Sequence, residues 1–186
     1  MDKNWTKALV EQLDWHWTNQ LRPRLEGLTD EEYYWEPVED TWSIRPRGQG
    51  RAAMSIGGGD LVMDYAYPEP TPPPVTTIAW RLWHVASDCL ADYLSRSSVS
   101  RPVGTTGTHW YGDVEPALRD LRSAIDAFRS HMTGLGEEGI REPMGPDWGM
   151  YGDQTWAELV VHATDEVAHH GAEIALLRDL YLWRER

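Results

Sequence analysis

Hydrophobic residues recur every three or four positions along four stretches of this 186-residue chain. This period is typical of amphipathic α-helices that bury one face. The stretches cover residues 5–26, 76–96, 113–133 and 153–183. No stretch shows the period-two alternation of a half-buried strand. The pattern therefore predicts an all-α protein, and an antiparallel four-helix bundle with long connecting loops is its simplest closure.

Polar residues mark the expected starts of two of these helices. Thr76 or Thr77 is placed to cap the second helix, and Asp153 or Thr155 the last one. Residues 36–75 are rich in glycine and proline, and they show no regular pattern. We expect this segment to be a long loop that lies over one end of the core.

The last predicted helix carries a dense cluster of ionisable residues, with three histidines and three carboxylates between positions 162 and 173. Because each residue advances about 100° around an α-helix, His170 falls inside the apolar stripe and Glu166 at its edge. His162 and His169 lie further out. An unpaired buried carboxylate is costly, so either a buried hydrogen-bonded pair or a metal ion is required.

The second predicted helix brings another histidine to the same interior. His84 borders its buried face, and Asp88 follows one turn later on the same side. Cys89 is predicted to point away from His84, which weakens a Cys/His nucleophile. His84, Glu166 and His170 together form a candidate metal site. Their imidazole and carboxylate donors suit zinc, and they also suit nickel or iron.

Three protein ligands would leave positions open for water or substrate, as in catalytic metal sites. Four neighbouring side chains are candidates to orient the ligand histidines through their free ring nitrogens: Asp88, His162, His169 and Glu173. A polar network or an exposed charged face explains the spacing equally well, because histidine-rich helices also occur on protein surfaces.

Composition and charge narrow the classes of partner. The chain has 30 acidic and 17 basic residues, a formal charge of −13. This acidic balance argues against nucleic acid or an anionic membrane as a partner. No run reaches the roughly 18 apolar residues of a membrane span. We therefore expect a small-molecule substrate.

The single cysteine, Cys89, leaves no disulfide framework, and a cytoplasmic location is expected. The length suits one domain over residues 1–186. Eleven tryptophans supply large rings for packing and for a pocket rim, and they also suggest a homodimer.

Three segments resemble the DinB family of DinB/YfiT-like metalloenzymes. They are Trp-Ser-Ile-Arg at 42–45, Trp-Arg-Leu-Trp-His-Val-Ala at 80–86, and the histidine-rich stretch at 162–178, which is the most specific. The resemblance implies a four-helix bundle. It also implies a divalent metal held by one residue of the second helix and two residues, four apart, of the last. In this chain those positions are His84, Glu166 and His170.

Glu166 stands where most members of the family have histidine. This set of two histidines and a glutamate resembles the branch that includes mycothiol-dependent maleylpyruvate isomerase. That branch implies a metal that activates a low-molecular-weight thiol, such as mycothiol, for attack on an electrophile. The sequence ends just after the fourth helix, so the isomerase's own substrate is not carried over. Arg81 and Arg45 are the candidates to bind the carboxylate of the thiol.

Three functions remain open at this point. The first is a metal-dependent thiol transferase, and the second is a metal-dependent hydrolase with Glu173 or Asp88 as base. The third is a non-enzymatic stress-response or binding bundle with a structural metal, whose acidic surface would contact a protein partner. An open coordination position beside an aromatic pocket favours an enzyme, whereas a closed four-ligand site favours a structural role.

Overall fold

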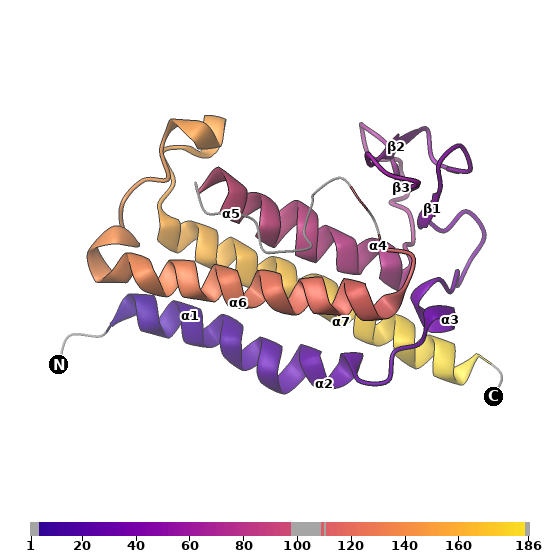
Figure 1. Cartoon of the computed structure of the whole chain (residues 1–186), viewed down its shortest axis with the longest axis horizontal. Helices are drawn as coiled ribbons and strands as arrows, with labels where there is room; N and C mark the ends of the chain where they lie inside the picture. The colour runs from indigo at the N-terminus through magenta and orange to yellow at the C-terminus, as the bar shows by residue number, and fades with distance from the viewer. Residues whose placement is uncertain (1–3, 98–108, 110, 185–186) are drawn as a thin grey trace.

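Four long helical rods run side by side in the computed structural model, which describes residues 4–97, 109 and 111–184 (Figure 1). The first rod consists of α1 (Trp5–His16), η1 (Trp17–Leu21) and α2 (Arg22–Leu25). The second consists of α4 (Ile78–Trp83), η2 (His84–Ala91) and α5 (Asp92–Arg96). The third rod is α6 (Val114–Gly139), and the fourth is α7 (Trp156–Trp183). Two short helices lie in the connections, α3 (Asp30–Tyr33) and the 3₁₀ helix η3 (Pro146–Tyr151). Within the described ranges, no helix is both long and apolar enough to cross a membrane.

The four rods close around one core, because α1 and η2 each pack against both α6 and α7. Side chains with no exposed surface fill the centre, among them Leu13, Leu90, Leu121, Phe128 and Val167. Gly171 lets α7 approach the first rod closely, since a Cβ atom there would lie 3.0 Å from Leu21 Cδ2. The predicted four-helix bundle is confirmed, and the fold is mostly helical.

The predicted helix starts agree with the observed caps. The Thr77 side chain accepts a hydrogen bond from the Trp80 amide, and Thr155 accepts one from the Glu158 amide. The third helix was predicted to end at residue 133, before Gly134 and Gly136; α6 runs on to Gly139, but its backbone is kinked and non-helical at Gly136. The positive φ of 66° at Gly136 is a conformation that glycine adopts without strain, so the regular helix is interrupted there and not at Gly134.

Two of the rods contain π-helical turns, η1 and η2. A π-helix hydrogen-bonds each residue to the one five positions away, so each residue advances less around the axis than in an α-helix. Residues five apart therefore come closer to sharing a face. In η2 this changes which side chains lie beside His84.

The expectation of no strands is wrong for residues 44–65. They form an antiparallel sheet of β1 (Ile44–Pro46), β2 (Met54–Ile56) and β3 (Leu61–Tyr65), in the order β1–β3–β2. Arg45 pairs with Val62, and Ser55 with Asp64. Strands of three to five residues are too short to show a clear period, and β2 is exposed at every position.

A buried carboxylate holds this sheet together and joins it to the bundle. Asp64 has no exposed surface. Its side chain accepts hydrogen bonds from the Ser43 amide at 3.0 Å and the Arg45 Nε at 2.9 Å, and from the Arg51 amide at 2.7 Å. The Trp80 indole donates to the Asp64 carbonyl at 2.9 Å, so the sheet is fixed to the start of α4 (Figure 1).

Asp64→Ala is expected to destabilise the protein by about 2–4 kcal/mol, because it leaves the Arg45 Nε and the Ser43 and Arg51 amides without their acceptor. Urea unfolding followed by circular dichroism measures this change. Asp60→Ala, an exposed carboxylate in the same sheet region, is the matched control and should change stability by no more than about 0.5 kcal/mol. Equal effects of the two substitutions would contradict the role given to Asp64.

Candidate metal centre

The structure brings His84, Glu166 and His170 together where η2 packs against α7. The Nε2 atoms of the two histidines approach the same oxygen of Glu166. His84 Nε2 lies 3.4 Å from Glu166 Oε2, and His170 Nε2 lies 3.1 Å from it. The two imidazole rings meet edge to face, 4.8 Å apart. Residues from two distant parts of the chain thus bring two imidazole nitrogens to one carboxylate oxygen.

The other ring nitrogen of each histidine faces a second carboxylate. His84 Nδ1 lies 3.6 Å from Asp88 Oδ2, and His170 Nδ1 lies 2.7 Å from Glu173 Oε2. Histidines that bind metals commonly have such a partner, because it holds the proton on Nδ1 and leaves Nε2 to bind the ion. Asp88 and Glu173 are therefore positioned to orient the two ligand histidines.

His162 and His169 each contact a carboxylate, and not a ring nitrogen of His84 or His170. His162 Nε2 lies 3.5 Å from Glu166 Oε1, and His169 Nε2 lies 3.5 Å from Glu173 Oε1. More than half of each side chain is exposed, 55% for His162 and 59% for His169. They neighbour the centre from outside, as their position on the helix predicts.

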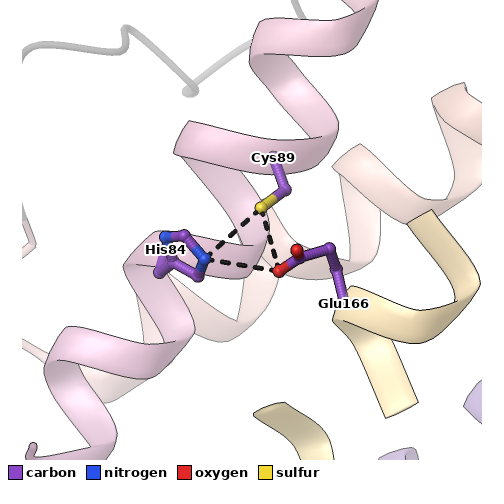
Figure 2. A group of neighbouring side chains, drawn as sticks. All are labelled: His84, Cys89 and Glu166. Atoms are coloured by element: carbon purple, nitrogen blue, oxygen red, sulfur yellow. Dashed lines mark hydrogen bonds and ion pairs between the residues drawn. The ribbon is translucent and has the colours of Figure 1, made fainter. Parts of the chain in front are cut away.

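The prediction that Cys89 points away from His84 is wrong. Its Sγ lies 3.6 Å from His84 Nε2 and 3.5 Å from Glu166 Oε2 (Figure 2). On an α-helix a residue five positions further on lies about 140° around the axis. The π-helical turn of η2 removes most of this offset and brings Cys89 onto the side of His84. A helical-wheel prediction assumes α-helical geometry throughout, so it could not place Cys89 beside His84.

Three donor atoms, His84 Nε2, Glu166 Oε2 and Cys89 Sγ, form a nearly regular triangle with sides of 3.4, 3.5 and 3.6 Å (Figure 2). A tetrahedral zinc ion, about 2.0–2.2 Å from nitrogen or oxygen and about 2.3 Å from sulfur, holds its ligands about 3.3–3.6 Å apart. The donor types and their spacing therefore fit a divalent ion such as zinc.

A second group of mutually close donor atoms comprises His169, His170 and Glu173, and it shares His170 with the predicted triad. Its Glu173 already pairs with Arg81. The group around His84 and Glu166 is therefore the better candidate for a metal.

The same contacts also fit the alternative explanation of the cluster, which is a hydrogen-bonded network without a metal. Burial lowers the pKa of His84, but hydrogen bonds with Asp88, Cys89 and Glu166 outweigh it and raise this pKa to about 11. Hydrogen bonds from His170 and His84 hold the pKa of Glu166 far below its ordinary value. At neutral pH the network is a cation beside an anion, and a metal ion would have to displace the proton of His84.

Both arginines predicted to bind a thiol carboxylate are already paired with carboxylates of the chain. Arg81 Nε lies 2.9 Å from Glu173 Oε2. Arg45 lies between Asp64, at 2.9 Å, and Glu36, at 2.8 Å. Arg45 thus belongs to the small sheet, and its contacts argue against the predicted role. Arg81 remains next to the centre, through Glu173.

A cavity of about 530 Å³ opens beside the candidate centre. Asp88 and His162 lie on its wall, with Leu159 and the aromatic rings of Tyr93 and Trp148. Sequence reasoning named the first two residues but missed the aromatic ones, because an aromatic residue in a helix or loop is more often part of the core. The site therefore has an adjoining space of the size that small-molecule ligands occupy.

The metal-free protein is expected to lose stability as the pH rises above neutral. The folded state keeps the His84 proton up to a pKa of about 11, whereas the unfolded chain loses it near pH 6.5. The stabilisation is therefore complete below about pH 6.5 and declines as the pH rises toward 11. In EDTA, the urea concentration at the unfolding midpoint should be lower at pH 9.5 than at pH 7. This decrease should be smaller in His84→Gln than in the wild-type protein. The same fall in both proteins would contradict this assignment.

We compared the sequence with models of known protein families, with curated proteins and with solved structures. The sequence model described as the DinB superfamily matches residues 12–174, which is most of the chain. The searches of curated proteins and of solved structures gave no match. The matched region includes His84, Cys89, Glu166 and His170. The chain therefore belongs to the DinB superfamily.

Proposed function

We propose that this protein is a divalent-metal-dependent enzyme that activates a low-molecular-weight thiol, such as mycothiol, for transfer to an electrophilic small molecule. Zinc is the expected ion, and His84, Glu166 and His170 would hold it. One observation carries the proposal: two histidine Nε2 atoms meet one Glu166 oxygen, while a carboxylate faces each Nδ1. Membership of the DinB superfamily supports a metal at this position.

When bound, a zinc-type ion supplies Lewis acidity, which lowers the pKa of a thiol so that a thiolate forms near neutral pH. The protein's own residues bind and orient the reactants. Asp88 and Glu173 fix the two imidazoles, while Tyr93 and Trp148 offer apolar surface for the electrophile in the adjoining cavity. The thiolate sulfur forms a bond to the electrophilic carbon, and the leaving group departs with its electron pair.

A metal-dependent hydrolase is the second candidate, and the position of Asp88 supports it. Asp88 lies between His84 and the cavity, where it could take a proton from water. Glu173 is the poorer base: burial raises its pKa, but hydrogen bonding to His170 and the charge of Arg81 lower it overall. A bundle with a structural metal is the third candidate, and the adjoining cavity argues against it.

Protein purified with zinc is expected to hold about one equivalent of metal. His84→Ala and His170→Ala should each reduce the bound metal severalfold, because each removes a ligand. Plasma mass spectrometry of the dialysed proteins measures this. His169→Ala is the matched control, since it removes an adjacent histidine of α7 whose side chain is mostly exposed. Equal metal in all four proteins would show that the predicted ligands do not bind the metal.

The zinc-loaded protein should conjugate mycothiol to 1-chloro-2,4-dinitrobenzene faster than the metal-free protein, as measured by absorbance of the thioether product. His170→Ala, treated in the same way, should lose this acceleration. Hydrolysis of 4-nitrophenyl acetate by the loaded protein, with no conjugation, would favour the hydrolase instead. Metal binding with neither activity would leave the structural role as the best explanation.

A further inference from the structure

We infer that Cys89 is a fourth protein ligand of this metal centre, and that its sulfur makes the site selective for thiophilic ions such as zinc over magnesium or manganese. The inference rests on the proposed function, because it requires that the cluster around Glu166 binds a metal. It adds a donor that the resemblance to the family does not imply.

The position of Cys89 is the first reason. It lies on η2 together with His84, and the π-helical turn carries both side chains to the face that packs on α7. Figure 2 shows His84 and Cys89 reaching from one helix toward Glu166 on the other. Cys89 is 4% exposed, so its sulfur is directed into the cluster and not into solvent.

The distances are the second reason. The sulfur is almost equally far from His84 Nε2, at 3.6 Å, and from Glu166 Oε2, at 3.5 Å. In the metal-free protein, protonated His84 donates to the sulfur and the thiol donates to Glu166, so hydrogen bonds account for both contacts. The same two separations also match a metal site. Equal separations are what three ligands around one ion show, and about 3.5 Å is the expected sulfur separation at a tetrahedral zinc site.

Other roles for this thiol fit less well. Cys89 is 4% exposed, so a substrate in solution has little access to its sulfur as a nucleophile. The chain has no second cysteine with which it could form a disulfide. A buried sulfur beside imidazole and carboxylate is, by contrast, a common part of zinc sites, whereas magnesium and manganese prefer oxygen ligands.

A sulfur from the protein would also occupy the position that a substrate thiol needs. The proposed thiol transfer then requires Cys89 to give way when the substrate enters. Four protein donors would close the site in the resting protein, which is the arrangement typical of a structural metal. Catalysis therefore requires a substrate thiol that displaces Cys89 from the metal.

Cobalt(II) substitution tests this inference, because cobalt bound to thiolate shows a strong near-ultraviolet charge-transfer band that cobalt bound only to nitrogen and oxygen lacks. We expect this band in wild-type protein loaded with one equivalent of cobalt. Cys89→Ser should lose the band, and it should bind cobalt more weakly by at least the roughly 10- to 100-fold that loss of an outer-shell partner costs. Ser87→Ala, a buried change in the same π-helical segment, should keep both the band and the affinity.

The outcomes separate the two proposals. If wild-type protein binds cobalt but shows no near-ultraviolet band, Cys89 is not a ligand and the metal centre still stands. If wild-type protein binds no cobalt or zinc, both proposals fail. The wild-type spectrum alone decides the role of Cys89, so the test does not depend on the stability of Cys89→Ser.

Discussion

The buried side of α7 carries a carboxylate, Glu166, and the arrangement around it follows from the need to compensate that charge. Only 18% of this side chain is exposed. Two imidazoles reach the same oxygen, and each imidazole is backed by a further carboxylate. A charge in this position is tolerated only with partners, whether they are protons on histidine or a metal ion. The pairing of η2 with α7 provides these partners.

The scaffold fixes this pairing from two sides. Close contact of Gly171 with Leu21 holds the helix of His170 against the first rod. On the other side, the Asp64 carbonyl of the small sheet accepts a hydrogen bond from the Trp80 indole. The Trp80 ring in turn stacks on the His84 ring, with the ring centres 5.4 Å apart. The sheet thus helps to set the orientation of the His84 ring. The connection between α6 and α7 lies at the other end of the bundle (Figure 1). Its helix η3 carries Trp148, which lines the cavity.

Helical periodicity was sufficient to predict the bundle and to place Glu166 and His170 inward, because those features depend only on a regular 100° step. It failed where the backbone departs from that step. The π-helical turn at His84 moves Cys89 into the cluster, and no propensity of single residues signals such a turn. The strands at residues 44–65 were missed because their stability comes from the buried Asp64 and its partners, which are distant in sequence.

The central claim is that a divalent metal binds between η2 and α7. The most direct measurement is anomalous diffraction at the zinc absorption edge from crystals of the zinc-loaded protein. We expect one strong anomalous peak in bonding contact with His84 Nε2, His170 Nε2 and a Glu166 carboxylate oxygen. A peak only at the exposed His162 or His169, or no peak in fully loaded crystals, would contradict it.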